Sequence, residues 1–342
     1  CSYSDIYSGV RKANLITLLI ALLSLVALYY TDKSIIQRLT QPITEFAYSA
    51  LNIGQGNFHA RIPEIKTQDE LRRLHDALGY MESSINNYIA ELRTTTSLNE
   101  RFESELTIAS AIQMQMLPKD FPNRDEIDLY ATLHPAKEVG GDLYDFFTSG
   151  RNLYFCVGDV SGKGVPAALY MAISRAAFRF IAGLELPTEG VVQRINNSFC
   201  DGNDSGMFVT MFVGCINLDT LEMKYCNAGH NPILIISPDG KPEYLHAKPN
   251  LAAGLFEDFP YQGETIQLEK GSRLVIYTDG VTEAEDSVKN LYGEDRLKQF
   301  AAKEDTAEDS VSFLTNLAAS IKSFTLDNDQ NDDITMMSIR LK

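Results

Sequence analysis

The stretch NLYFCVGDVSGKGVPAALYMA, residues 152–172, contains a buried strand, an acidic strand end, a glycine-rich turn and a helix start. Its apolar and aromatic run predicts a strand over 152–160, and Asp159 falls near the end of that strand. Gly162 and Gly164 then interrupt the pattern, and apolar residues at helical spacing predict a helix over 165–182. This order of elements places a carboxylate where a strand gives way to a glycine turn.

Similar apolar runs and helical patterns follow this stretch. Strands that neighbour in sequence are joined by turns such as Asp219–Thr220 and Asp239–Gly240, which favours antiparallel pairing. We therefore expect an α+β fold with mainly antiparallel sheets inside and helices outside. Further strands are predicted within 207–218, 222–229, 232–237, 273–280 and 333–341, and further helices over 188–199, 294–302 and 306–324.

Further acidic residues share the position of Asp159 at a strand end. Asp142 lies in EVGGDLYDFF, Asp279 follows RLVIYT, and Asp332–Asp333 precede ITMMSIRL. Antiparallel neighbours bring the exit of one strand and the entry of the next to the same sheet edge, so these carboxylates can converge. Hard oxygen donors without clustered His or Cys select Mg²⁺ or Mn²⁺. For any single aspartate a solvated turn residue is the commoner role, so the prediction depends on all of them.

The charge, length and cysteine content of the chain limit the classes of protein to which it can belong. The 342 residues carry 30 Lys+Arg against 46 Asp+Glu, a formal charge of -16, which disfavours nucleic-acid binding. The length suits two or three modules. The five cysteines are odd in number and form no CxxC, so we expect reduced thiols and neither a disulfide framework nor a zinc site.

The amino-terminal part predicts a membrane anchor. Residues 13–30, ANLITLLIALLSLVALYY, carry no charge and are long enough to be a transmembrane helix. Residues 1–12 are interpreted as the end of a truncated extracytoplasmic region, with a lipid-anchored Cys1 as the less favoured alternative. Basic residues on both sides of the span leave its orientation open.

The segment after the span resembles a HAMP domain over residues 33–92. The marks of this resemblance are Pro42, Gly56, Phe58, Asp69–Glu70 and Leu74. A coiled-coil seam supports it independently, with alternating spacings of three and four at Leu71, Leu74, Leu78, Met81, Ile85, Tyr88 and Leu92, and such a seam needs a partner helix. Residues 93–117 are predicted as a helical signalling linker, and for 98–116 an amphipathic helix packed on its own domain is an equal alternative.

The carboxyl-terminal part resembles the metal-dependent type-2C protein phosphatases, in the bacterial branch of RsbU/SpoIIE-type serine phosphatases. The resemblance extends over about residues 111–342 and implies a phosphatase domain over 118–342, built as a layered α-β-β-α sandwich of two sheets. It rests on the blocks AIQMQMLP (111–118), VGGDLYDFF (139–147), GDVSGKGVPAALYMA (158–172), MFVTMFVG (207–214), NAGHNP (227–232), YTDGVTEA (277–284), YGEDRL (292–297) and NDDIT (331–335).

This resemblance implies a site and an activity. Two Mn²⁺ or Mg²⁺ ions would be held by the catalytic aspartates and one backbone carbonyl, and would activate water against a phosphoserine or phosphothreonine of a protein, such as an anti-sigma-factor antagonist of the STAS type. A homodimer through the HAMP domain and coiled coil, in the bacterial cytoplasmic (inner) membrane with the phosphatase in the cytoplasm, is also implied. The implied ligands are Asp142, Asp159, Val160 through its carbonyl, Asp279 and Asp332, with Asp333 as a less certain outer candidate.

Three neighbouring residues have open roles. Lys163 is a candidate phosphate contact or an ordinary solvated lysine, and His230 is either an edge residue of the site or a residue that shapes its loop. Many eukaryotic relatives carry a histidine as proposed general acid where this chain has Ser161, so that role is vacant here.

Two alternative functions remain. A catalytically inactive phosphatase fold could serve as a binding scaffold. VGGDLYDFF also partly matches the GGDEF signature of diguanylate cyclases, but Leu143 and Tyr144 depart from it and the later acidic blocks would be unexplained.

Overall fold

The computed structural model describes residues 3–65, 68–122, 124–326 and 328–342. Cys1 and Ser2, at the start of the predicted extracytoplasmic remnant, lie outside these ranges. The chain forms two compact units, residues 1–102 and 103–342. Each unit has its own packing, and they are described separately.

The first unit begins with a long apolar helix. Helix α1 (Tyr3–Ile35) contains the predicted span, and it leads through a π-helical turn (η1, Ile36–Thr40) into α2 (Gln41–Gly54). The described side chains of α1 are exposed, and the helical stretch from residue 7 onward is long and apolar enough to cross a membrane. Helix α4 (Val165–Ala182) is also long and apolar enough to cross a membrane, but several of its residues are buried in the second unit, so it is a core helix. The amino-terminal helix fits a membrane-anchored protein.

Helix α2 packs against the start of α3 (Glu70–Met116) in the region predicted as a HAMP domain. Phe46 of α2 is buried with Leu71 and Leu78 of α3, and the Ser49 hydroxyl donates a hydrogen bond of 2.9 Å to the Arg61 carbonyl. Met81 further along the predicted seam is 51% exposed in the single chain. Exposed apolar residues at coiled-coil spacing are typical of a helix that packs against a partner helix.

The second unit contains two five-stranded sheets in which all strand pairs are antiparallel, as predicted. One sheet has the order β1-β10-β9-β6-β7 and the other the order β2-β3-β4-β5-β8. The strands are β1 (Ile127–His134), β2 (Leu143–Ser149), β3 (Asn152–Val160), β4 (Val209–Asn217), β5 (Glu222–Ala228), β6 (Leu234–Ile236), β7 (Pro242–Tyr244), β8 (Glu264–Gln267), β9 (Arg273–Tyr277) and β10 (Ile334–Leu341).

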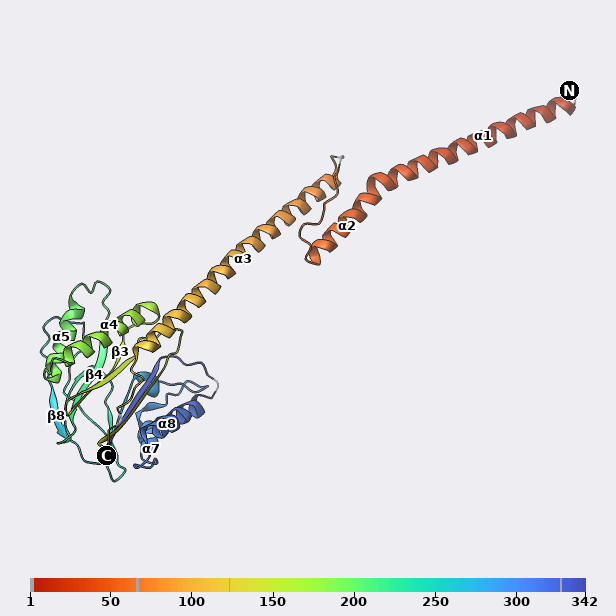
Figure 1. The fold of residues 1–342 in the computed structure, drawn as a ribbon. Coiled ribbons are helices and arrows are strands. Elements are labelled where there is room, and N and C mark those ends of the chain that lie inside the picture. The colour runs from red at the N-terminus through yellow and green to blue at the C-terminus, as the bar shows by residue number, and fades with distance from the viewer. Residues whose placement is uncertain (1–2, 66–67, 123, 327) are drawn as a thin grey trace. The chain divides into compact units, whose positions relative to one another are not determined.

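Helices cover the outer face of each sheet in the second unit (Figure 1). Helices α4 (Val165–Ala182) and α5 (Thr188–Cys200) pack on the β2–β8 sheet, and α8 (Ser310–Thr325) packs on β1 and β10. The predicted α-β-β-α layering is therefore confirmed. The remaining helices are the short α6 (Asp279–Thr282) and α7 (Gly293–Ala301).

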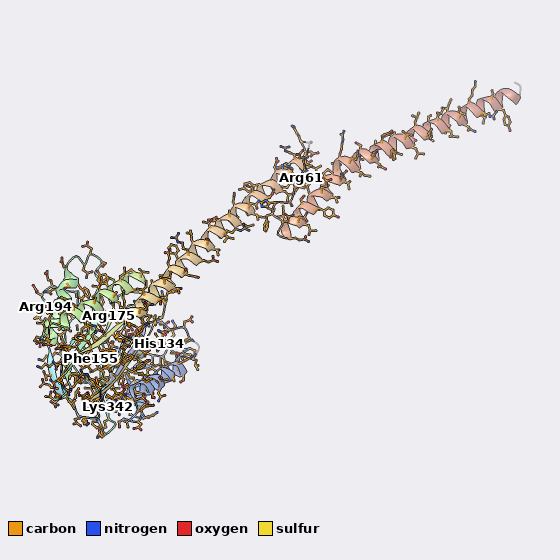
Figure 2. The ribbon with its side chains drawn as sticks, in the orientation of Figure 1. Arg61, His134, Phe155, Arg175, Arg194 and Lys342 are labelled. Carbon is orange, nitrogen blue, oxygen red and sulfur yellow. The ribbon has the colours of Figure 1, made fainter. Side chains whose placement is uncertain are left out.

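The facing apolar residues of the two sheets form the main core, and a second cluster lies between the β1–β7 sheet and the helices on its outer face. Phe155 of β3 is fully buried in this interior (Figure 2), and its ring stacks on Phe212 of β4 with centroids 6.1 Å apart. Gly214 opposite has no side chain because a Cβ there would lie 2.2 Å from the Phe155 ring. Cys156, Cys200, Cys215 and Cys226 are free thiols, as expected. This packing fixes the strand ends on which the acidic residues sit.

Candidate active site

The predicted acidic residues come together where the two sheets meet. Asp142 immediately precedes β2, whose first residue Leu143 pairs with Gly158 of β3, so Asp142 lies beside Asp159. On the other sheet, the Thr278 amide donates to the Thr335 carbonyl (3.1 Å), which brings Asp279 near the residues that precede β10. Strands far apart in sequence therefore deliver these carboxylates to one place. Sequence reasoning placed Asp279 at a strand end, but the structure makes it the first residue of α6.

Asp142 is the most deeply buried of these carboxylates. It is 2% exposed, and its Oδ2 accepts hydrogen bonds of 2.6 Å from the hydroxyls of Thr278 and Thr335. Burial, and then the neighbouring Asp159, raise its pKa well above the ordinary value, although the two hydroxyls oppose that rise. The threonines thus hold the Asp142 carboxyl in one orientation. They were not predicted from the sequence.

Asp159 and Asp279 experience the same concentration of negative charge. Burial raises the pKa of Asp159 to about 7, with further contributions from Asp279, Asp332 and Asp333. Burial and then Asp332 raise the pKa of Asp279. Carboxylates this close raise one another's pKa, and a bound cation would offset that repulsion. Their grouping therefore indicates a candidate cation site.

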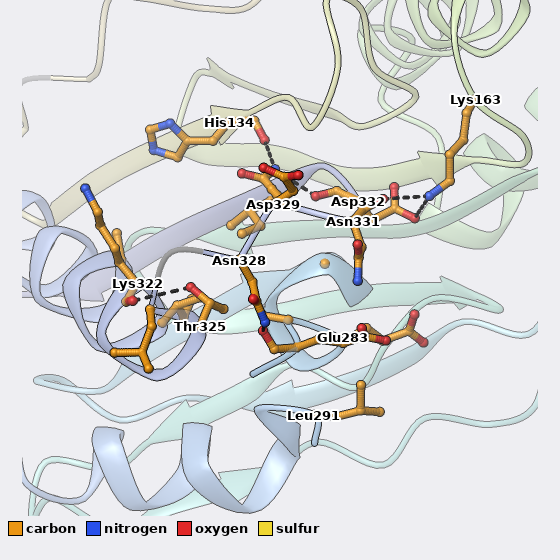
Figure 3. Close-up of a pocket in the computed structure, with 18 residues that line it drawn as sticks. His134, Lys163, Glu283, Leu291, Lys322, Thr325, Asn328, Asp329, Asn331 and Asp332 are labelled. Atoms are coloured by element: carbon orange, nitrogen blue, oxygen red, sulfur yellow. Dashed lines mark hydrogen bonds and ion pairs between the residues drawn. The ribbon is translucent and has the colours of Figure 1, made fainter. Parts of the chain in front are cut away.

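Asp332 is held by a lysine. The Lys163 ammonium group, on the turn after β3, donates to Asp332 Oδ2 at 2.7 Å and to the Asn331 carbonyl at 2.8 Å (Figure 3). The hydrogen bond to Asp332 raises the pKa of Lys163, which keeps the lysine charged. Lys163 is therefore paired with Asp332, while its side chain remains 53% exposed and lines both cavities described below.

Asp333 supports the glycine loop that precedes Asp142. Its Oδ1 accepts from the Ala136 amide (2.9 Å), and its Oδ2 accepts from the amides of Gly141 (2.8 Å) and Asp142 (3.4 Å). A Cβ at Gly140 would lie 1.9 Å from the same carboxylate. Both oxygens of Asp333 thus accept hydrogen bonds from the loop backbone and hold the loop that precedes Asp142.

The glycine loop also contacts the end of helix α3. The Gln113 side chain is 6% exposed, and it donates to the Gly140 carbonyl (2.7 Å) and accepts from the Gly140 amide (3.1 Å). One side chain therefore satisfies both backbone groups of a residue two positions before Asp142. The sequence block AIQMQMLP was identified, but not this contact.

The donor set fits Mg²⁺ or Mn²⁺. A small cavity of about 20 Å³ lies among the glycine loop, Asp159, Asp332 and Asp333, which is about the volume of one bound water or ion. Gly141 lines this cavity at a point where no side chain fits. A Cβ at Gly141 would lie 2.8 Å from the Val160 carbonyl oxygen and 3.4 Å from Asp159 Oδ1. Carboxylate and carbonyl oxygens are the ligands that these hard cations prefer. In the part of the chain that the structure describes, no three His, Cys, Asp or Glu side chains already surround one point at ligand distances.

His230 and Ser161 have structural roles. The His230 amide donates to the Asn227 side chain (2.7 Å), the Asn227 amide group donates back to the His230 carbonyl (2.9 Å), and burial lowers the pKa of His230 to about 4. The Ser161 hydroxyl accepts from the Phe208 amide at 3.0 Å. The Ser161 side chain and the backbone of His230 therefore shape loops beside the acidic residues. The imidazole Nδ1 of His230 lies 3.0 Å from the Thr210 hydroxyl, and its buried Nε2 has no hydrogen-bond partner among the described residues.

A larger cavity adjoins the acidic site. It has a volume of about 550 Å³ and shares Lys163, Asn331 and Asp332 with the small cavity. Figure 3 shows Lys163 and Asp332 on one side of it and Glu283 and Leu291 on another. No local pattern in the sequence indicates this cavity, because its walls come from segments far apart in the chain.

Comparison with known proteins agrees with this architecture. Residues 149–342 match the family of stage II sporulation protein E (SpoIIE), and residues 34–81 match the HAMP domain. The chain is 28% identical to protein IcfG of Synechocystis over 99% of its own length, but it spans only 57% of that protein. It is 30% identical to the phosphoserine phosphatase RsbU of Bacillus subtilis, with 74% of each chain covered.

Solved structures show the same fold. The SiaA-PP2C domain of Pseudomonas aeruginosa superposes with a TM-score of 0.64 at 18% identity, covering 71% of this chain and 98% of that one. The PP2C phosphatase domain of SpoIIE from Bacillus subtilis gives 0.56 at 20% identity, covering 63% and 62%. The family match includes the late acidic blocks that a diguanylate cyclase would leave unexplained. The chain belongs to the SpoIIE family of PP2C-type serine phosphatases, with a HAMP domain ahead of its phosphatase domain.

Proposed function

We propose that this chain is a membrane-bound signalling phosphatase that removes phosphate from a serine or threonine of a protein, with an anti-sigma-factor antagonist of the STAS type as substrate. The observation that carries the proposal is the group of acidic residues gathered between the two sheets, with carboxyl pKa values raised by burial and by one another. The relatives RsbU and RsbP are named phosphoserine phosphatases, which supports the same chemistry here.

The ligands in this proposal are Asp142, Asp159, Asp279, Asp332 and the carbonyl of Val160. Two divalent cations, Mn²⁺ or Mg²⁺, would supply the positive charge that lowers the pKa of water and stabilises the phosphoryl group in its transition state. The chain's own part is to orient these oxygens: Thr278 and Thr335 fix Asp142, and Asp333 fixes the loop before it. Lys163, which now pairs with Asp332, would have to release it when that carboxylate becomes a ligand.

We infer that helix α3 regulates the site. Gln113 at its end is hydrogen-bonded to Gly140, and Asp142 follows two residues later, so a rotation or shift of the helix changes the loop directly. The exposed seam that includes Met81 supports a parallel homodimer as the source of such movement. The segment of residues 93–117 would carry the signal from the HAMP domain to the phosphatase.

The proposed location is the bacterial cytoplasmic membrane, with the phosphatase domain in the cytoplasm. The apolar helix α1 and the HAMP match support the anchor. The basic residues on both sides of the span do not fix its direction, so the side follows from the proposed substrate, a cytoplasmic regulator.

The test is Mn²⁺-dependent turnover by the full chain in detergent. We expect release of phosphate from a phosphoserine protein and from p-nitrophenyl phosphate with Mn²⁺, none with EDTA, and none in Asp159→Asn. Asp219→Asn is the matched control, because Asp219 is exposed and lies in the turn after β4, at the opposite end of β3 and β4 from Asp159. Turnover by Asp159→Asn equal to the control would remove the assigned site. Absence of turnover by the unaltered chain would favour the scaffold alternative.

A further inference from the structure

The cavity of about 550 Å³ beside the acidic site is the largest unassigned feature near the proposed chemistry. It opens onto Lys163, Asn331 and Asp332, which also line the small cavity of the acidic residues. A phosphoserine bound at the acidic site therefore has neighbouring residues within reach of it, because three extended residues span about 10 Å. Because the two cavities share these lining residues, we take the substrate chain itself as the occupant of the larger one.

The lining of this cavity combines apolar and charged side chains. Ala318 and Ile321 of α8 line it together with Leu291, which is 48% exposed although it is a large aliphatic side chain. The charged residues of the lining are mainly acidic: Glu283, Glu285, Asp329 and Asp332 lie there with Lys163 and Lys322. Such a lining favours a neutral aliphatic side chain and opposes an acidic one.

The walls of the cavity are held in place by hydrogen bonds. The Asn328 side chain donates to the Glu285 carbonyl (3.3 Å), and the Gln330 side chain donates to the carbonyls of His134 and Asp332 (2.7 Å each). The Asp286 carboxylate accepts from the amides of Val288 (2.9 Å) and Asn290 (2.8 Å), which shapes the loop that carries Leu291. A preformed pocket loses little free energy to ordering when a ligand enters.

We propose that this cavity is a specificity subsite that takes an aliphatic side chain of the substrate protein within about three residues of its phosphoserine, with Leu291, Ala318 and Ile321 as its apolar lining. This inference rests on the proposed phosphatase function and names what that site recognises. The subsite would select among phosphoproteins by sequence, while the acidic site acts on any phosphoserine.

The experiment uses the full chain in detergent with Mn²⁺ and short synthetic peptides that contain one phosphoserine in an alanine background. Leu or Asp is placed in turn at each nearby position. At one or more positions we expect Leu to give about 10-fold higher kcat/KM than Asp. In Leu291→Ser this preference should fall to about twofold or less, through KM, while p-nitrophenyl phosphate hydrolysis is unchanged.

Val288→Ser is the matched control, because Val288 lies on the same loop, is 73% exposed and does not line the cavity. It should keep the full preference. Ala318→Leu is a second variant that narrows the cavity at its apolar wall and should also weaken the preference, while p-nitrophenyl phosphate turnover reports that both variants are folded.

Three outcomes would overturn the inference. If the unaltered chain hydrolyses p-nitrophenyl phosphate but shows no preference for Leu, the subsite is refuted and the phosphatase function stands. If it hydrolyses neither kind of substrate, both fail together. If Leu291→Ser changes the oligomeric state and leaves the preference intact, the surface belongs to a second copy of the chain.

Discussion

Replacing Gln113 by Ala tests whether helix α3 controls the acidic site. The change removes two hydrogen bonds and leaves the amide and the carbonyl of Gly140 without partners in a buried setting. An unsatisfied buried polar group costs about 1–3 kcal/mol, so the two together disfavour the present loop conformation by about 2–6 kcal/mol. Even the lower value shifts the conformational equilibrium about 30-fold, since about 1.4 kcal/mol corresponds to a factor of ten.

The assay is hydrolysis of p-nitrophenyl phosphate by the full chain at fixed Mn²⁺. Gln113→Ala should lower kcat/KM by about 30-fold or more. Gln113→Glu should have a kcat/KM between those of the unaltered chain and Gln113→Ala, or lower still. Glu can still accept from the Gly140 amide but cannot donate to the Gly140 carbonyl. Gln115→Ala is the control, since Gln115 is exposed two residues away on the same helix. Equal activity in Gln113→Ala and Gln115→Ala would refute the coupling between helix and loop.

Two more predictions concern stability and assembly. Burial and neighbouring aspartates raise the pKa of Asp159 to about 7, so the folded chain binds this proton more tightly than the unfolded chain, and without metal its stability falls as the pH rises from about 4 through 7. The pKa of His230 is lowered to about 4, so this residue makes stability rise with pH and opposes the effect of Asp159. The quantity to measure is therefore the difference in melting temperature in EDTA between the unaltered chain and Asp159→Asn. A difference independent of pH would contradict the prediction. Met81→Glu, in the exposed seam, should convert a dimer into monomers in light scattering of the detergent-solubilised chain, whereas Tyr80→Glu, 78% exposed on a neighbouring helix position, should not. A monomeric unaltered chain would remove the basis of the dimer proposal.

Local patterns in the sequence predicted antiparallel sheets inside and helices outside, and the resemblance to the phosphatases implied the two-sheet sandwich. The run at 152–160 became β3 with the same bounds, and the predicted helix over 165–182 is α4. Strands β1, β2, β7 and β8 were not predicted, although IDLYATLH at 127–134 alternates in the way a half-buried strand does. The short helix α6 was missed because four residues are too few for a periodicity to appear.

The acidic residues could be predicted because each follows or precedes a recognisable strand. Their supports could not: the hydroxyls of Thr278 and Thr335 reach Asp142 from the other sheet, and sequence periodicity does not report contacts between sheets. The partners of Arg273 could not be predicted either. Arg273 begins the apolar run RLVIY and is 2% exposed, and its guanidinium donates to the hydroxyls of Ser310 and Ser338. Partners of buried polar groups depend on tertiary packing, which no local pattern contains.

Isothermal titration of Mn²⁺ into the full chain tests the central claim most directly, because it measures cation binding without requiring a substrate. The unaltered chain should bind about two ions at neutral pH, and Asp142→Asn and Asp279→Asn should each bind fewer, while Asp219→Asn binds as the unaltered chain does. Failure of the unaltered chain to bind Mn²⁺ or Mg²⁺, or binding that both variants retain in full, would contradict the assignment of these aspartates as the metal site of a phosphatase.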